Sequence, residues 1–147
     1  MFNWLEQAIG VLVITLVLLD VFLTVLYARA GTGILSTRVS KFVRRVFYFA
    51  SKPFGPFRGT VMSFCGPVVL VLLVAMWDFG LTLGAALVIH PALGASVVNA
   101  SGATPTDFIT ALQAGGNSTS IVGSGEFSPQ TSAFRLFYLF ASLTGTA

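Results

Sequence analysis

Two long apolar segments constrain the fold of this chain more than any other feature. The first extends from about Trp4 to Ala28 and the second from about Val61 to Ile89. A helix needs about 20 mostly apolar residues to cross a bilayer, so each segment is long enough. The composition agrees, because 55% of the 147 residues are hydrophobic and only 9% are charged, whereas ordinary soluble domains carry about 25% charged residues. We therefore expect an all-α membrane protein with one small membrane domain.

A third apolar segment begins at about residue 130 and is still apolar at Ala147, where the sequence stops. At about 1.5 Å per residue it would form roughly 25 Å of helix, which barely reaches across the hydrocarbon core. We thus predict three transmembrane helices, the third (130–147) being truncated. On this basis we expect the chain to be a fragment or a shortened protein.

The basic residues predict an orientation. Seven of the eight lie between the first two apolar segments, in a connection without any acidic residue: Arg29, Arg38, Lys41, Arg44, Arg45, Lys52 and Arg58. Because cytoplasmic loops are enriched in Lys and Arg, this connection should be cytoplasmic and the N-terminus should lie outside. No basic residue precedes the first apolar segment, and Glu6 is found there instead. A cleaved secretory signal is therefore not expected.

The basic connection also has helical periodicity. Apolar residues recur on one side of it, at Val39, Phe42, Val43, Val46, Phe47 and Ala50. This pattern predicts an amphipathic helix that ends before Pro53. Such a helix would lie in the inner interface, with Arg38, Lys41, Arg44 and Arg45 near anionic lipid headgroups. Two roles remain open for it: a topology determinant only, or a lipid-sensing or gating element.

Ionisable residues within the apolar segments need a partner, because a charge in hydrocarbon is costly. In the expected topology Asp20 lies toward the inner leaflet and Asp78 toward the outer one, so we do not expect them to touch. Structural pairing and a role in transport both remain open for each. The candidate partners are Arg135 or Trp77 for Asp78, and Thr24 or Arg29 for Asp20. His90 precedes Pro91, which should end the second helix, and is interpreted as an interfacial residue, with a pH effect as the alternative.

A shorter helix is predicted over 104–118, after a Gly-, Ala- and Ser-rich loop (91–103) without fixed structure. Thr104 suits the N-cap, Pro105 the first helical position, and Asp107 the third, where it complements the helix dipole. Gly115 and Gly116 weaken its end. Residues 119–126 then follow at membrane depth, and non-helical backbone is tolerated there only against protein or water. They should therefore form a re-entrant turn.

The sequence from Ala111 to Gly145 contains a set of residues at characteristic spacing: Val122, Gly123, Gly125, Pro129, Thr131, Arg135 and Gly145. The segment resembles the pore loop of the potassium-channel family, whose signature T-V-G-Y-G-D precedes a Pro, a Thr and an Arg before the inner helix. The filter is divergent and reads I-V-G-S-G-E. Ile121 replaces the family's Thr, Ser124 its Tyr and Glu126 its Asp.

The resemblance implies an organisation. An N-terminal transmembrane helix (1–30) and the cytoplasmic basic segment (31–60) would precede a pore domain (61–147). That domain would contain an outer helix (61–90), a turret (91–103), a pore helix (104–118), a filter (119–126) and the start of an inner helix (130–147). Backbone carbonyls of Ile121, Val122, Gly123, Ser124 and Gly125 would bind the ion, supported by Asn117, Glu126 and Arg135, with a hydrogen bond expected between Glu126 and Asn117. Gly145 would be a gating hinge, and four copies would surround the pore.

The expected function is passive cation conduction, in the cytoplasmic membrane of a bacterium. Potassium is the expected ion and sodium the alternative, because Ile121 lacks the hydroxyl of the innermost site and Ser124 cannot set the filter width as a tyrosine does. A different class of function stays open, a non-conducting accessory or transporter-like membrane protein that keeps the pore-loop fold. We expect no enzyme, cofactor, nucleic-acid partner or resident metal, and with Cys65 as the single cysteine no internal disulfide. The sequence does not indicate the gating stimulus.

Overall fold

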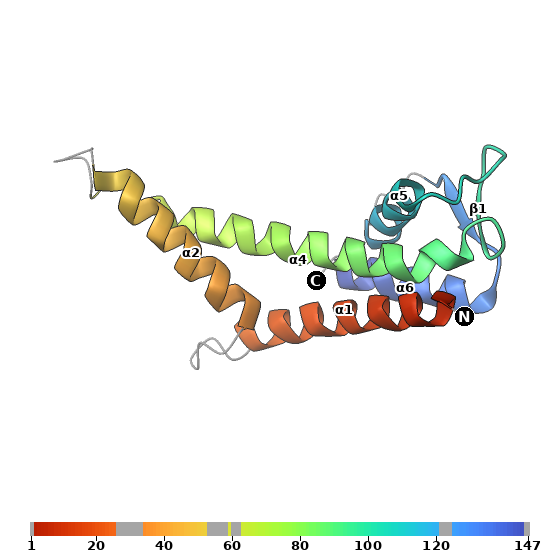
Figure 1. Ribbon diagram of the computed structural model, residues 1–147, viewed down its shortest axis with the longest axis horizontal. Coiled ribbons are helices and arrows are strands. Elements are labelled where there is room, and N and C mark those ends of the chain that lie inside the picture. Colours follow the sequence, from red (N-terminus) through yellow and green to blue (C-terminus); the bar gives the residue numbers. More distant parts are fainter. Residues whose placement is uncertain (1, 26–33, 53–58, 60–62, 121–124, 146–147) are drawn as a thin grey trace. The chain divides into compact units, whose positions relative to one another are not determined.

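The computed structural model describes residues 2–25, 34–52, 59, 63–120 and 125–145. They are mostly helical and belong to two compact units: unit 1 comprises Met1–Val17 and Asp78–Ala147, and unit 2 comprises Leu18–Trp77. The elements, in chain order, are α1 (Phe2–Val25), α2 (Ile34–Ser51), α4 (Cys65–Ile89), the 3-10 turn η2 (His90–Ala92), β1 (Val97–Asn99), α5 (Phe108–Thr119), β2 (Phe127–Pro129) and α6 (Ser132–Gly145) (Figure 1). The helices α1 and α4 each contribute to both units.

The two long apolar segments are helices, as predicted. The stretches Asn3–Val25 and Cys65–Ala92 are long and apolar enough to cross a membrane. The second helix ends at Ile89, just before the His90-Pro91 pair that was expected to stop it. The third predicted span is described as the 14-residue helix α6, which is shorter than the roughly 20 residues that a crossing needs.

In unit 1, small residues bring α1 and α4 together. A Cβ atom added to Gly10 would lie 2.7 Å from the carbonyl oxygen of Gly84, and one added to Gly84 would lie 2.6 Å from Cγ1 of Ile14. Gly80 is as tightly packed, since its Cβ would lie 2.7 Å from Cγ2 of Val17. Glycines at a helix crossing let two backbones approach closely, which is how helices commonly pack in membranes.

The loop expected to lack fixed structure (91–103) contains a strand instead, so that prediction is wrong. β1 pairs antiparallel with β2, with Val97 opposite Pro129, Val98 opposite Ser128 and Asn99 opposite Phe127. Val97 and Val98 are β-branched, as strands favour, and Val97 is fully buried. The strand was missed because its partner lies some thirty residues further along the chain.

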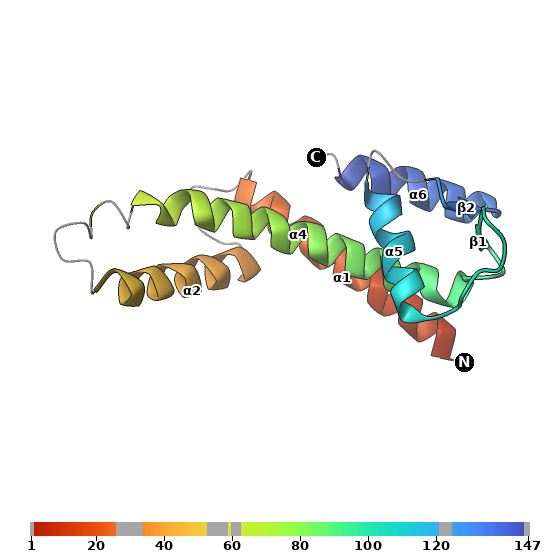
Figure 2. The same cartoon turned by 90° about the horizontal axis from the view of Figure 1, so that it is seen from above.

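The hydrophobic core of unit 1 joins this two-stranded ribbon to the helices. It consists of Ala86, Ile89, Ala92, Leu93, Val97, Ala111, Ala114 and Phe127, with Leu112, Phe134, Phe137 and Tyr138 packed against it. Figure 2 shows α5 lying between α4 and α6. The small side chains of α5, Ala111 and Ala114, are fully buried there.

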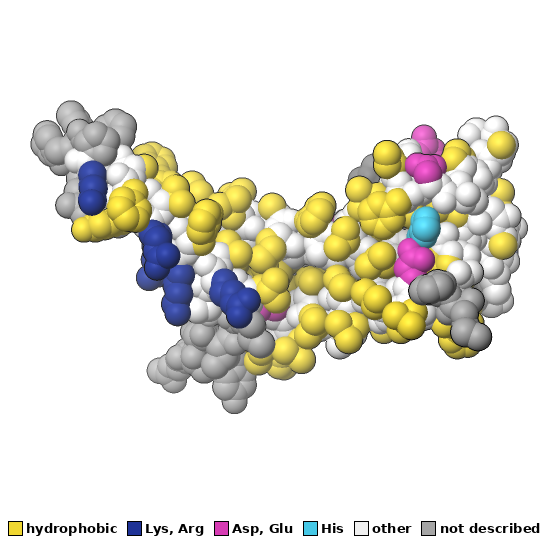
Figure 3. Space-filling view, in the orientation of Figure 1, with side chains coloured by type: hydrophobic (Ala, Val, Ile, Leu, Met, Phe, Trp, Pro, Cys, Tyr) yellow, Lys and Arg dark blue, Asp and Glu magenta, His cyan; other side chains and the backbone are white. Residues whose placement is uncertain are grey.

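Unit 2 contains the predicted amphipathic helix. α2 ends at Ser51, before Pro53, as expected. Val43 is buried, whereas Phe42 and Val46 on the same apolar side are exposed. Figure 3 shows Lys and Arg side chains gathered along α2. One cation, Lys52, lies 5.0 Å from the centre of the Phe49 ring.

Candidate functional site

The start of α5 is capped by Asp107. Its carboxylate accepts hydrogen bonds from the backbone N–H of Thr110 at 3.3 Å and from the Thr110 hydroxyl at 2.6 Å. The bond from the hydroxyl holds the pKa of Asp107 below its usual value of 3.8. Thr104 was predicted to be the N-cap, and that prediction is wrong, because the helix begins at Phe108. The Thr104 hydroxyl instead accepts the backbone N–H of Asn99 at 2.9 Å and ties β1 to the loop before α5.

The end of α5 is closed by its own hydroxyl groups. Ser118 donates to the carbonyl of Gly115 at 2.7 Å, and Thr119 donates to the carbonyl of Gly116 at 3.1 Å. Both side chains are buried. The last turn contains no basic residue, so no cation of this helix compensates the partial negative charge at its C-terminus.

Two glycines place this helix end between α4 and α6. A Cβ atom on Gly115 would lie 2.7 Å from the carbonyl oxygen of Thr82 and 2.8 Å from the backbone nitrogen of Ala86. Gly145, near the end of α6, lies so close to the carbonyl oxygen of Thr119 that a side chain there would collide with it. Sequence reasoning treated Gly115 only as a weak point of the helix, whereas the structure shows that it permits a close contact with α4.

These contacts determine the path of the chain. α5 ends beside the C-terminal end of α6, but α6 begins about 20 Å away, at the other end of a 14-residue helix. α5 therefore ends at the opposite end of α6 from β2, which pairs with β1.

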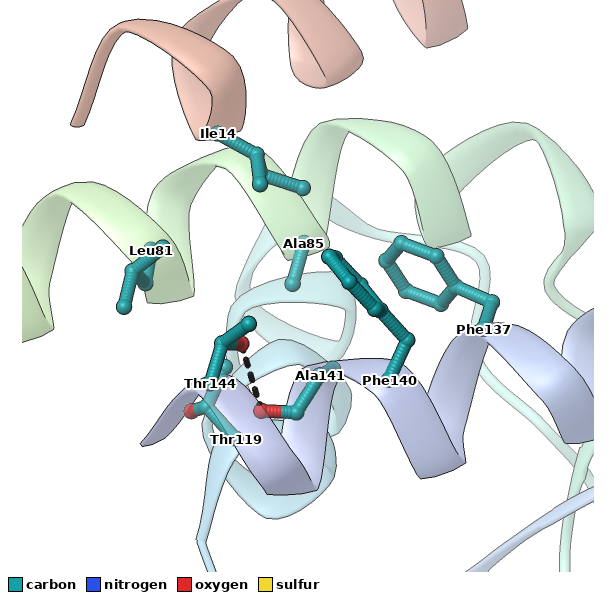
Figure 4. A pocket seen from close by; sticks show the side chains of 8 residues that line it. All are labelled: Ile14, Leu81, Ala85, Thr119, Phe137, Phe140, Ala141 and Thr144. Atoms are coloured by element: carbon teal, nitrogen blue, oxygen red, sulfur yellow. Dashed lines mark hydrogen bonds between the residues drawn. The ribbon is translucent and has the colours of Figure 1, made fainter. Parts of the chain in front are cut away.

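A small apolar cavity lies at the junction of these helices (Figure 4). Its lining comes from α1, α4, α5 and α6: Ile14, Leu81, Ala85, Thr119, Phe137, Phe140, Ala141 and Thr144. The hydroxyl of Thr144 donates to the carbonyl of Ala141 at 2.8 Å and is therefore satisfied within α6. No residue of this lining is charged.

Four of the five predicted filter residues, Ile121, Val122, Gly123 and Ser124, lie outside the described residues. The fifth, Gly125, has a φ of +68°, a left-handed conformation that glycine adopts at little cost.

Glu126, which follows Gly125, is exposed, and its backbone carbonyl accepts the N–H of Ala100 at 2.7 Å. This bond holds the residue beside β1.

The hydrogen bond expected between Glu126 and Asn117 is absent. Gln113 donates to the Glu126 carboxylate instead, with 2.7 Å between Nε2 and Oε2. Gln113 lies one helical turn before Asn117, nearer the end of α5 that adjoins the ribbon. The Nδ2 atom of Asn117 is buried and has no hydrogen-bond partner in the part of the chain that the structure describes.

The expected pairing of Asp78 with Arg135 is also wrong. Arg135 donates from Nε to the carbonyl of Pro129 at 3.2 Å and thereby joins α6 to β2. Asp78 is exposed, and within residues 2–25, 34–52, 59, 63–120 and 125–145 it forms no ion pair or hydrogen bond. The alternative partner of Asp78, the Trp77 indole, bonds to Asp20.

Asp20 is the one acidic residue in the sequence of unit 2. It is 3% exposed and accepts the backbone N–H of Leu35 at 2.9 Å, that of Ser36 at 3.3 Å, and the Trp77 indole N–H at 3.0 Å. Because the first N–H groups of a helix have no partner within it, Asp20 supplies the cap of α2 from another helix.

Neither of the two residues proposed as partners of Asp20 is seen to bond to it. Thr24 bonds to the hydroxyl of Ser36 at 2.8 Å, beside Asp20 rather than to it, and Arg29 lies outside the described residues.

His90 has a partner that the sequence did not reveal. Its Nδ1 lies 2.7 Å from a carboxylate oxygen of Glu6, so the pair joins the start of α1 to the end of α4. The ring centre of Phe108 is 6.0 Å from that of His90. This cluster therefore also reaches the first residue of α5.

The sequence matches no protein-family model, no curated protein and no solved structure.

Proposed function

We propose that this chain is a subunit of a homotetrameric channel that conducts cations, potassium in the first place, passively across a bacterial cytoplasmic membrane. The observation that carries the proposal is the path of the chain around α5. This helix of 12 residues is too short to cross a bilayer, it ends against Gly145 of α6, and the chain then returns to β2.

Helix polarity favours a cation at the end of α5. The C-terminus of a helix carries a partial negative charge, and the last turn of α5 has no basic residue to offset it. Four such ends around an axis would create a cation-attracting point within the membrane. In this proposal the carbonyls of residues 121–125 replace part of the ion's hydration shell just beyond it.

The surroundings of the filter support the same function. The Gln113–Glu126 hydrogen bond and the Arg135–Pro129 hydrogen bond brace the backbone that follows residue 124. In the proposed channel Gln113 takes the bracing role that the resemblance gave to Asn117, and Arg135 keeps its supporting role. Gly145 packs against Thr119, so a movement of α6 at this hinge would reach the end of α5 directly.

Exposed apolar surface supports assembly with other copies. One side of α6 presents Leu136, Leu139, Phe140 and Leu143, all at least half exposed, at helical spacing. Asp78 is also exposed within an apolar helix, and an intramembrane acid usually faces protein or water rather than lipid. A tetramer would offer both kinds of surface a protein or aqueous environment.

Ion flux and assembly test the proposal. The purified protein, reconstituted in liposomes, should pass potassium above the rate of empty liposomes and should crosslink as a tetramer. Gly123→Ala should abolish flux, because a filter backbone with aligned carbonyls needs glycine there. Gly59→Ala is the matched control, since a Cβ at Gly59 meets nothing within 4 Å, and its flux should be unchanged.

A folded protein that passes no ions would favour the alternative function, an accessory or transporter-like subunit. The close α1–α4 packing through Gly10 and Gly84 is the feature that such a protein would share, because it stabilises a helix pair without requiring a pore.

A further inference from the structure

An open groove of about 440 Å³ lies between α2 and α4 in unit 2. It is lined by Arg38, Val39, Phe42 and Val43 from α2 and by Leu72 from α4. The Phe42 side chain is 68% exposed and that of Leu72 44% exposed, so apolar walls face outward along the groove. Arg38 is the one charged residue of the lining.

The basic side chains of α2 have no ion-pair partner among the residues that the structure describes. The sequence contains no acidic residue between Asp20 and Asp78. Asp20 itself is buried and takes its hydrogen bonds from backbone N–H groups and the Trp77 indole. Among the residues that the structure describes, Arg38, Lys41, Arg44 and Arg45 form no ion pair, and the single pair found is Glu6 with His90. Apart from the buried carboxylate of Asp20, unit 2 therefore offers no anion of its own to these side chains.

We propose that this groove binds an anionic glycerophospholipid, with an acyl chain along Val39, Phe42 and Leu72 and the phosphate at Arg38. Such a molecule satisfies both properties of the groove at once, because it combines a chain that covers apolar surface with a negative headgroup. A neutral lipid would leave Arg38 without a counter-charge, and a free phosphate would leave the apolar walls in water.

A second copy of this chain fits the groove less well. Its own α2 region is equally free of acids, so it would bring no carboxylate from that region to Arg38. Enclosing a cation without its counter-charge is costly. The lipid is therefore the occupant that matches the charge, and its binding does not depend on whether the protein conducts ions.

Lipid titration followed by native mass spectrometry tests this site. The purified, delipidated protein in detergent is titrated with phosphatidylglycerol, with phosphatidylcholine of the same acyl chains, and with glycerol phosphate as the headgroup alone. Phosphatidylglycerol should bind most tightly. Arg38→Gln should weaken its binding about fivefold and weaken phosphatidylcholine binding less, because the choline cation of that lipid already offsets the charge of its phosphate.

Arg44→Gln is the matched control, because it removes the same charge from the same helix outside the groove. Arg44 lies six positions after Arg38, which is about 120° around the helix. Its substitution should weaken phosphatidylglycerol binding less than twofold. Equal losses in the two variants would overturn the site in favour of unspecific attraction to the whole helix.

A third variant tests the apolar wall. Phe42→Ser should weaken the binding of both lipids, provided that circular dichroism and gel filtration show a folded, monodisperse protein. Two results would overturn the proposal: glycerol phosphate binding as tightly as phosphatidylglycerol, or a Phe42→Ser protein that binds lipid normally but loses its oligomeric mass. The second result would assign the groove to another copy of the chain.

Discussion

At the scale of single residues, Asp20 and Asp78 use the same side chain in opposite ways. Asp20 is buried and holds three N–H groups from two other helices, whereas Asp78 is exposed and pairs with no described residue. The sequence predicted that both acids are costly in an apolar segment, but their partners depend on tertiary pairing. Asp20 bonds to residues 15, 16 and 57 positions away, and no local pattern indicates such bonds.

Removing the Asp20 carboxylate should therefore destabilise the protein. We expect Asp20→Ala to lower the free energy of unfolding by about 2 kcal/mol, because it leaves buried donors without an acceptor. Asp78→Ala makes the same change where no bond is lost and should stay within about 0.5 kcal/mol of the parent. Unfolding in mixed detergent, followed by circular dichroism, measures both. Similar losses in the two variants would contradict the assignment of Asp20 as the cap of α2.

Selectivity of the proposed channel is also decided at this scale. Ile121→Thr should raise the potassium to sodium permeability ratio, because four hydroxyls would complete the innermost ring of ligands. Reversal potentials of the reconstituted protein measure the ratio. Ile109→Thr makes the same chemical change on the exposed side of α5 and should leave the ratio unchanged. A parent that is already strongly selective, with no further change in Ile121→Thr, would contradict this role.

At the scale of elements, apolar length and periodicity predicted α1, α2 and α4 well, and the helix α5 in part. The predicted start of α5 was four residues too early. Thr104 and Asp107 are both suitable N-cap residues, and Asp107 is the N-cap because the Thr104 hydroxyl accepts the backbone N–H of the strand residue Asn99 instead. The β ribbon was missed because β1 and β2 are far apart in the sequence, and the sequence of a short strand does not indicate which distant strand it pairs with. Of the five residues expected to bind the ion, the structure describes only Gly125.

The two adjacent glycines of α5, Gly115 and Gly116, should respond differently to substitution by alanine. Gly115→Ala should destabilise unit 1 by about 1–3 kcal/mol, because its Cβ would press on the backbone of α4. Gly116→Ala is its neighbour and control. Its Cβ would meet only Cγ2 of Thr82, at an ordinary 3.7 Å, so the change should stabilise the helix by up to about 1 kcal/mol. Thermal unfolding of the two variants gives the comparison, and a loss of stability in Gly116→Ala would contradict it.

At the scale of the whole molecule, orientation rests on the distribution of charge rather than on contacts. The connection between the first two apolar helices contains seven of the eight basic residues, and the positive-inside rule predicts from them that this connection is cytoplasmic. Charge counting can predict such an orientation from sequence. The relation between copies cannot be predicted in this way, because it depends on how exposed faces such as that of α6 meet.

Labelling of single cysteines tests the orientation. In a Cys65→Ala background, Gly59→Cys should react with an impermeant thiol reagent only from the cytoplasmic side, and Ala103→Cys only from the outside. Both positions are exposed, whereas Cys65 is buried. The reverse labelling would place the β ribbon in the cytoplasm and would exclude a filter that opens outward.

The hydrogen bonds of Asp20 also have a consequence for biosynthesis. As α1 leaves the ribosome, its carboxylate enters the translocon before any partner has been made. Leu35 follows 15 residues later and Trp77 follows 57 residues later. An isolated Asp in an inserting helix opposes insertion by up to about 3 kcal/mol, a cost that the nascent chain must carry during this interval. The first span should therefore become stably integrated only when α4, which contains Trp77, has emerged, so α1 would mature late although it is synthesised before α2 and α4.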